Sequence, residues 1–225
     1  METLPSFAQA NLVQWHRIAE GTPLPRLYGV LDLSAIDGRG LKLFDVARAW
    51  RDAGIGLVQY RDKLSPSMTM ISNAMRIREI FRGSDTLLVM NDSPSMARDA
   101  GLSAVHIGQT DGTVNAALRA VPYIGLSTHT EAQVIEADQT SAAYLAIGPV
   151  FRTRSKTDAD PVVRLEGVRS ARRLTRKPLV AIGGITLENA ASVLEAGADS
   201  VAVISSLLDG PNLETRAREF LDLVA

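Results

Sequence analysis

The fold is decided by one stretch of sequence, residues 178–205, which reads PLVAIGGITLENAASVLEAGADSVAVIS. It begins and ends with short apolar runs, 178–182 and 200–204, and its middle carries apolar residues at helical spacing. Thr186 is a suitable helix N-cap and Gly197 a suitable stop at the other end. The apolar runs are continuous rather than alternating, which is typical of strands buried on both faces of a parallel sheet. The stretch therefore predicts a strand–helix–strand unit.

The same unit repeats outward along the chain, from residue 27 to the end. Continuous apolar runs predict eight strands, at 27–33, 57–61, 86–90, 103–107, 123–126, 142–147, 178–182 and 200–204. Amphipathic stretches that follow them predict helices at 45–53, 66–82, 94–100, 113–120, 130–139, 164–176, 187–196 and 213–224. This regular alternation indicates an α/β protein with a single (β/α)₈ TIM barrel. A doubly wound open sheet is the alternative, but such a sheet more often has fewer strands.

The first 26 residues stand outside the repeat, and residues 27–225 are predicted to form the barrel domain. The segment from Ser6 to Glu20 predicts an extra N-terminal helix, which Gly21 and the prolines after it would end. We favour a plug over the floor of the barrel for this extension. A dimer contact is the alternative, and the sequence leaves open whether the protein is a homo-oligomer.

Composition excludes several classes of function. The 225 residues include 24 Lys and Arg against 25 Asp and Glu, a formal charge of −1, which argues against nucleic-acid and membrane-surface partners. The chain has no cysteine, which excludes disulfides and thiol catalysis. It also has neither a run of roughly 18 apolar residues nor a secretory signal, so the expected location is cytoplasmic.

Polar residues follow the predicted strands at the points where a barrel places its active site. Gln59, Arg61 and Lys63 share one face of an extended chain because side chains alternate along a strand. An amide with two cations suits a phosphorylated ligand, since Arg offers a bidentate fork and Lys a point charge. A solvated strand end is the alternative interpretation.

The next two strands are each followed by a carboxylate, Asp92 in one loop and Asp111 in the other. Either loop by itself is common turn chemistry. Two carboxylates opposite an Arg/Lys pair are more specific, because Mg²⁺ is usually held by one or two carboxylates while substrate phosphates complete its coordination shell. We interpret His106 as a hydrogen-bonded core histidine rather than a metal ligand. The carboxylates predict a magnesium-bound diphosphate.

The loop after the sixth predicted strand completes the diphosphate site, and the ends of the last two strands predict a second anion site for a monophosphate. Loop 148–157 is rich in hydroxyls and cations, which is typical of a mobile anion clamp. Gly183–Gly184 and Ser205 follow the last two strands, where barrels frequently bind a phosphate. A Ser127–His129 nucleophile pair is disfavoured because no nucleophile elbow accompanies it. Two anion sites indicate a transferase that joins two phosphorylated substrates.

These motifs form an ordered set along the chain: Gln-x-Arg-x-Lys, Asn-Asp, His-x-Gly-Gln-x-Asp, Gly-x-Ser-Thr-His, Gly-Pro-Val-Phe-x-Thr-x-Ser-Lys, Ala-Ile-Gly-Gly-Ile and Val-Ile-Ser. From Leu27 to Leu207 the set resembles the thiamine-phosphate synthase family. The resemblance implies Mg²⁺-dependent coupling of 4-amino-2-methyl-5-(diphosphooxymethyl)pyrimidine to a thiazole phosphate, or its carboxylate, with release of pyrophosphate. It also implies a dissociative substitution that needs no strong general base.

The resemblance further implies roles for single residues. The implied magnesium ligands are Asp92 and Asp111. The implied contacts to the pyrimidine diphosphate, with all residues of the first motif included, are Gln59, Tyr60, Arg61, Asp62, Lys63, Asn91, Ser127 and Lys156. The implied contacts to the thiazole phosphate are Thr153, Arg154, Ser155, Gly184, Ile204 and Ser205. The residues expected to act catalytically on the leaving diphosphate are Arg61, Lys63, Ser127 and Lys156.

The chain departs from the family pattern at three places. Ser93 stands where the family often has arginine, Arg154 and Ser155 alter the hydroxyl clamp, and Arg164 replaces a usual glycine. Two rival functions remain: a thiazole tautomerase-like isomerase and a non-catalytic thiazole-phosphate-binding relative. Because the chain keeps the charged positions of the predicted diphosphate site, the synthase is favoured over both.

Overall fold

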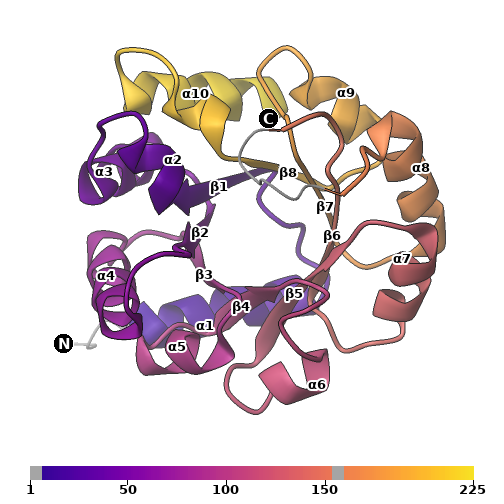
Figure 1. Cartoon of the computed structure of the whole chain (residues 1–225), viewed down its shortest axis with the longest axis horizontal. Helices are drawn as coiled ribbons and strands as arrows, with labels where there is room; N and C mark the ends of the chain where they lie inside the picture. The colour runs from indigo at the N-terminus through magenta and orange to yellow at the C-terminus, as the bar shows by residue number, and fades with distance from the viewer. Residues whose placement is uncertain (1–6, 154–159) are drawn as a thin grey trace.

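A computed structural model of the chain describes residues 7–153 and 160–225 and shows a closed barrel of eight parallel strands in sequence order (Figure 1). The strands are β1 (Leu27–Asp32), β2 (Leu57–Arg61), β3 (Leu87–Asn91), β4 (Ala104–Ile107), β5 (Tyr123–Thr128), β6 (Tyr144–Ile147), β7 (Leu179–Ile182) and β8 (Ser200–Val203). β1 pairs with both β2 and β8, which closes the sheet. The predicted (β/α)₈ barrel is confirmed, and the open sheet is excluded.

Helices surround the barrel on its outer side (Figure 1). The exception is α1 (Phe7–Ala19), which crosses one end of the barrel. The other helices are α2 (Leu33–Asp37), α3 (Leu43–Ala53), α4 (Ser67–Ile80), α5 (Pro94–Asp99), α6 (Val114–Ala117), α7 (Glu131–Asp138), α8 (Arg164–Leu174), α9 (Ala190–Glu195), α10 (Leu213–Val224) and the 3₁₀ helix η1 (Ser205–Leu208). The main core lies between the strands and this ring, where Trp50, Phe81 and Phe220 are fully buried. A second, smaller core fills the inside of the barrel.

One local prediction about a helix needs correction, and two short helices were not predicted. The sequence did not indicate α2, which exists because Asp32 Oδ1 accepts the N–H of Ala35 and caps a five-residue helix. It did not indicate η1 either. Thr186 is not the cap of α9: the side chain of Asn189 accepts the Thr186 N–H in a turn, so the helix begins only at Ala190. The predicted glycine stop after α3 is confirmed, with Gly54 left-handed at φ 92°.

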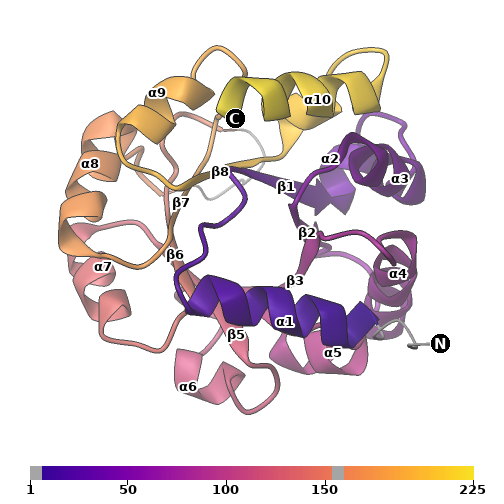
Figure 2. The same cartoon turned by 180° about the vertical axis from the view of Figure 1, so that it is seen from behind.

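The N-terminal helix α1 lies across the amino-terminal ends of the strands (Figure 2). Trp15 is fully buried there and stacks on Tyr123 and Tyr144, with ring centroids 5.6 and 6.1 Å apart. Asn11 Nδ2 donates to the carbonyl oxygen of Thr86 at 2.8 Å, which fixes the helix to the start of β3. The extension is therefore a plug over the barrel floor, as the sequence favoured.

Replacing Trp15 with alanine is expected to lower the free energy of unfolding by about 3–5 kcal/mol, because the change removes a large buried side chain and leaves a cavity under the barrel. Urea unfolding followed by circular dichroism measures the loss. Val13→Ala is the control on the same helix, since Val13 is 53% exposed and its truncation is expected to change the unfolding free energy by less than about 0.5 kcal/mol. Equal effects of the two changes would mean that the plug does not stabilise the barrel.

Within the described part of the chain, every helix is too short or too polar to cross a membrane.

Candidate active site

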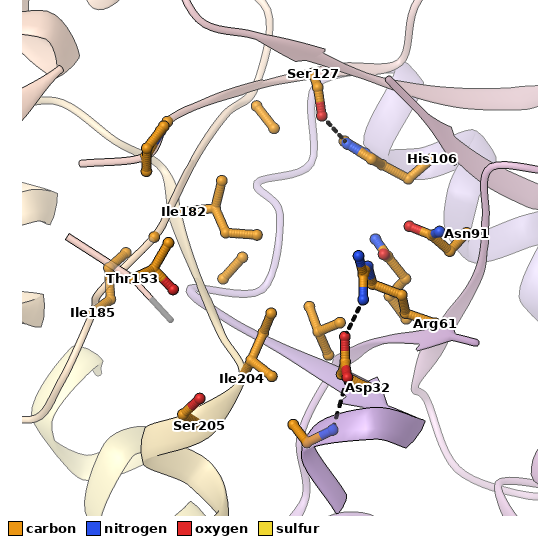
Figure 3. A pocket seen from close by; sticks show the side chains of 18 of the residues that line it. Asp32, Arg61, Asn91, His106, Ser127, Thr153, Ile182, Ile185, Ile204 and Ser205 are labelled. Carbon is orange, nitrogen blue, oxygen red and sulfur yellow. Dashed lines mark hydrogen bonds and ion pairs between the residues drawn. The ribbon is translucent and has the colours of Figure 1, made fainter. Parts of the chain in front are cut away.

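A cavity of about 1300 Å³ opens at the carboxyl ends of the strands, opposite α1, and side chains from all eight strands line it. Figure 3 shows Asp32, Arg61 and Asn91 on one wall, and Thr153 and Ser205 on the wall across from it. The sequence-predicted residues that line the cavity are Gln59, Arg61, Lys63, Asn91, Asp92, Asp111, Ser127, Thr153, Gly184, Ile204 and Ser205. The predicted contacts Arg154, Ser155 and Lys156 lie outside the described residues.

The guanidinium of Arg61 is held at the cavity wall by the neighbouring strand. Asp32 and Arg61 are register partners on β1 and β2, and Arg61 Nη1 donates to Asp32 Oδ2. The Asp32 side chain is only 3% exposed, and its other oxygen accepts the N–H of Ala35 at 2.9 Å. One buried carboxylate thus caps α2 and orients Arg61, which leaves guanidinium N–H groups toward the cavity.

Two residues of the Gln-x-Arg-x-Lys motif, Tyr60 and Asp62, do not line the cavity, and their role in substrate binding stays a prediction. The hydroxyl of Tyr60 donates to Asp62 Oδ2 at 2.9 Å and accepts from Asn73 Nδ2 of α4 at 3.1 Å. Asp62 Oδ1 accepts the N–H groups of the two residues that follow Lys63, at 3.0 Å each. Because side chains alternate along β2, Tyr60 faces the helices while Gln59 and Arg61 face the cavity. Tyr60 and Asp62 therefore shape the β2–α4 loop.

One of the two predicted metal ligands, Asp92, pairs with the second cation of the motif, and the other, Asp111, caps its own loop. Lys63 Nζ forms an ion pair with Asp92, and Asp111 Oδ2 accepts the N–H of Gly108 at 2.8 Å. Burial raises the pKa of the Asp92 carboxyl and the charge of Asp111 raises it too, while Lys63 lowers it. Asp92 also has φ 61°, an uncommon backbone conformation for a residue other than glycine.

This pair of carboxylates fits a hard divalent cation. Carboxylate oxygens are donors that Mg²⁺ prefers, and a cation bound between Asp92 and Asp111 would offset the repulsion of their two negative charges. Within residues 7–153 and 160–225, no group of three His, Cys, Asp or Glu side chains could hold a metal ion. Asp92 and Asp111 would thus leave most of an octahedral shell to water and ligand oxygens.

His106 is hydrogen-bonded at both ring nitrogens, which agrees with its interpretation as a core histidine. Nδ1 lies 3.0 Å from the hydroxyl of Tyr144, and Nε2 lies 2.8 Å from Ser127 Oγ (Figure 3). The Ser127–His129 pair does not form, because His129 Nδ1 donates to the carbonyl oxygen of Gly148 at 2.6 Å. His129 Nε2 lies 3.4 Å from Asp160.

The imidazole of His106 is expected to stay neutral well below pH 6.5. Removal from water lowers its pKa from the usual 6.5 to about 4. The unfolded chain binds the proton more readily, so the stability linked to His106 is complete above pH 6.5 and falls as the pH drops toward 4. An NMR titration of the ring protons in metal-free protein measures the midpoint. A midpoint between 6 and 7 would contradict a desolvated imidazole.

The opposite wall is built from a turn that requires glycine. Gly183 and Gly184 have φ 105° and 65°. A Cβ on Gly183 would lie 2.6 Å from Pro149 Cβ, and one on Gly184 would lie 2.5 Å from the carbonyl oxygen of Arg152. The turn therefore packs directly under loop 149–152 and brings backbone, rather than side chains, to the cavity beside Thr153 and Ser205.

The sequence was compared with known proteins. A family model described as "Thiamine monophosphate synthase" matches residues 27–207. The chain belongs to the thiamine monophosphate synthase family. Within that family, the thiamine-phosphate synthase of Koribacter versatilis is 42% identical over 212 residues, 92% of this chain and 99% of that protein. The thiamine-phosphate synthase of Methanoculleus marisnigri is 40% identical over 202 residues, 88% of this chain and 95% of that protein.

A solved structure agrees with this assignment to the thiamine monophosphate synthase family. The thiamine phosphate pyrophosphorylase from Pyrococcus furiosus superposes with a TM-score of 0.79 at 29% sequence identity. The match covers 89% of this chain and 95% of that chain. A 3-hexulose-6-phosphate synthase is similar with a TM-score of 0.67 at 14% identity, which shows the shared fold alone.

The sequence did not indicate Asp32 and Tyr28, which line the cavity of this thiamine monophosphate synthase family member, or Tyr144, which belongs to the core inside the barrel. Asp32 ends β1 on the inward face, so the rule that strand ends carry the site could have found it. Tyr28 lies four residues before Asp32 on the same inward face of β1 and accepts from Gln59 Nε2 at 2.7 Å. Tyr144 lies on the inward face of β6. Both tyrosines sit in apolar runs and so were indistinguishable from ordinary core residues.

Proposed function

We propose that the protein is a thiamine-phosphate synthase. The reaction would join 4-amino-2-methyl-5-(diphosphooxymethyl)pyrimidine to a thiazole phosphate, giving thiamine phosphate and pyrophosphate. If the thiazole phosphate carboxylate is the substrate, its carboxylate group leaves as CO₂ in addition. The observation that carries the proposal is the arrangement on one cavity wall: the carboxylates of Asp92 and Asp111 beside the cations of Lys63 and Arg61. Family membership and the names of the relatives support it.

The cationic wall would hold the diphosphate of the first substrate. Arg61 is preoriented by Asp32, so its planar donors need little ordering when they meet phosphate oxygens. Lys63 is paired with Asp92 in this structure, and its ammonium group would also contact the phosphate oxygens of a bound diphosphate. Lys156 is proposed as a further contact on the basis of the family resemblance.

The carboxylate pair would hold Mg²⁺. A bound ion of that kind supplies positive charge to phosphate oxygens and so favours a diphosphate as leaving group. Asp92 and Asp111 are the residues that would bind it, and their donor atoms fit it. Neither carboxylate is proposed as a general base, because the reaction has no proton for them to remove.

The reaction that fits this wall is a dissociative substitution. The bond between the pyrimidine methylene carbon and the diphosphate oxygen breaks, and its electron pair leaves with the diphosphate. The lone pair of the thiazole nitrogen then forms the new C–N bond. Arg61 and Lys63 stabilise the charge that develops on the departing group, a contribution that is largest where the donors are already in place.

The opposite wall would hold the thiazole phosphate. The Gly183–Gly184 turn and Ser205 offer close backbone and a hydroxyl at the ends of β7 and β8, where barrels frequently bind a phosphate. Thr153, which follows β6, adds a second hydroxyl to the same wall. Ile204 would contact the thiazole itself, since it lies inside the cavity beside Ser205. An isomerase of the same fold that acts on a thiazole phosphate would need the same wall. The wall therefore does not discriminate between a synthase and an isomerase.

The test is pyrophosphate release from the pyrimidine diphosphate, measured with and without the thiazole phosphate. Release that needs the thiazole phosphate, stops on addition of EDTA, returns with excess Mg²⁺ and yields thiamine phosphate is the expected result. A folded protein that binds the thiazole phosphate and makes no thiamine phosphate contradicts the proposal. Interconversion of thiazole tautomers in that case would identify the isomerase, and binding without turnover would identify a non-catalytic relative.

A further inference from the structure

A continuous chain of hydrogen bonds crosses the inside of the barrel. Gln59 Nε2 donates to the hydroxyl of Tyr28 at 2.7 Å, and that hydroxyl lies 2.9 Å from the hydroxyl of Tyr144. The Tyr144 hydroxyl lies 3.0 Å from His106 Nδ1, and His106 Nε2 lies 2.8 Å from Ser127 Oγ. The five residues come from five different strands, and the chain ends at a side chain that lines the cavity.

These hydrogen bonds can run in two directions, and in one of them every bond has both a donor and an acceptor. A hydroxyl has one proton and a neutral imidazole has one N–H. If Tyr28 donates to Tyr144, and Tyr144 donates to His106 Nδ1, every bond has one donor and one acceptor. The imidazole proton must then sit on Nε2, where it donates to Ser127 Oγ. The hydroxyl proton of Ser127 remains for the cavity.

The opposite direction conflicts with the start of the chain. If Ser127 donated to Nε2, the imidazole proton would sit on Nδ1 and donate to Tyr144, which would donate to Tyr28. The proton of Tyr28 would then face the amide N–H of Gln59, which is itself a donor. Tyr28 and Tyr144 are each 1% exposed, so water offers no ready alternative acceptor. His106 carries a single ring proton in either direction, which agrees with the neutral imidazole that removal from water favours by lowering its pKa.

The residues packed around this chain of hydrogen bonds hold the rings of Tyr144 and His106 in place. A Cβ on Gly125 of β5 would collide with Tyr144 Cζ and would lie 2.6 Å from His106 Nδ1, so the absence of a side chain there lets the two rings meet. Tyr144 stacks on His106 with centroids 5.5 Å apart and an angle of 27°. Trp15 of the plug stacks on Tyr144 from the floor side. The position of the Tyr144 hydroxyl is thus fixed from below and from the side.

We infer that this chain holds His106 as the Nε2–H tautomer and thereby makes the Ser127 hydroxyl a hydrogen-bond donor toward the cavity. Tyr28 and Tyr144 are positioning residues, which act on a ligand only through His106 and Ser127. The group that Ser127 meets is an acceptor, and a phosphate oxygen is the acceptor that follows if the proposed function holds. The inference about the tautomer itself does not depend on that function.

The test is ¹⁵N NMR of protein with labelled histidine, because the two ring nitrogens of each tautomer have different shifts. The folded protein without ligand is expected to show His106 with its proton on Nε2. A proton on Nδ1 overturns the inference, and this result needs no variant. In Tyr144→Phe the donor to Nδ1 is gone, so the tautomer population is expected to shift toward Nδ1–H. An unchanged population in the folded variant also overturns the inference.

Activity gives a second readout. Tyr144→Phe is expected to lower turnover by about threefold to tenfold, the effect of one misdirected hydrogen bond. Tyr123→Phe is the matched control: Tyr123 stacks on the same Trp15, but its hydroxyl lies at the floor, outside the chain, so tautomer and turnover are expected to stay unchanged. Ser127→Ala should lower turnover while His106 keeps its Nε2 proton. If the tautomer is as expected and the unaltered protein makes no thiamine phosphate, the proposed function fails and the hydrogen-bond chain stands.

Discussion

Arg61→Gln is expected to lower turnover by about 10²–10³-fold, the usual effect of removing one preorganised donor from a developing negative charge. The guanidinium is the cation on this wall that a buried carboxylate holds in place, so its geometry is already set before a diphosphate arrives. Pyrophosphate release at saturating substrates measures the effect. Arg61→Lys keeps the charge but loses the planar fork, and its turnover should fall between that of Arg61→Gln and that of the unaltered protein.

The free energy of unfolding of the Arg61→Gln variant must be measured as well as its turnover. Without Arg61, the carboxylate of Asp32 stays buried with the Ala35 N–H but no cation, and such a broken pair costs about 3–5 kcal/mol. Rates are therefore compared at a temperature where the variant is fully folded. Arg48→Gln is the control, because Arg48 forms an exposed pair with Asp45 on α3. A folded Arg61→Gln variant that turns over within twofold of the control would falsify the assignment of this wall to the leaving group.

Asp92→Asn is expected to lower turnover by about 10²-fold and to raise the Mg²⁺ concentration needed for half-maximal rate by about tenfold or more. The change keeps the shape of the side chain and removes one of the two charges that would hold the ion. It also breaks the pair with Lys63, so part of the loss should persist at saturating Mg²⁺. Titration of pyrophosphate release with Mg²⁺ separates the two effects.

The control for this experiment lies on the same strand–helix unit. Asp99 is on α5, exposed and paired with its neighbour Arg98, and Asp99→Asn should leave both turnover and Mg²⁺ dependence unchanged. An Asp92→Asn variant with the same Mg²⁺ dependence as the Asp99→Asn variant would remove Asp92 from the metal site. Direct Mg²⁺ binding by calorimetry gives the same answer without turnover.

The barrel was predictable because parallel strands buried on both faces leave continuous apolar runs in the sequence. The short helix α2 was not, because its five residues are too few to show helical periodicity. Helix α2 forms because Asp32 caps its first turn. A carboxylate at a strand end looks the same in a sequence whether it caps a helix, orients an arginine or binds a ligand. Here it does the first two.

The candidate site was predictable where alternation along a strand applies. That rule places Gln59 and Arg61 in the cavity and, applied strictly, excludes Tyr60, which the motif as a whole had included. The rule is silent about Tyr28 and Tyr144, because an inward tyrosine in an apolar run shows its role only through its partners in space. Partners that come from β1, β4 and β6 are separated by too much sequence to be read from spacing.

The plug and the last helix have a consequence for laboratory work on this protein. The segment that matches the family model, 27–207, contains neither α1 nor α10. Expressed alone, it would uncover Tyr144 at the floor and would remove Phe220 from against the outer core. Residues 27 and 207 are therefore poor ends for a shortened protein, and a protein cut at these residues should aggregate rather than form a minimal enzyme.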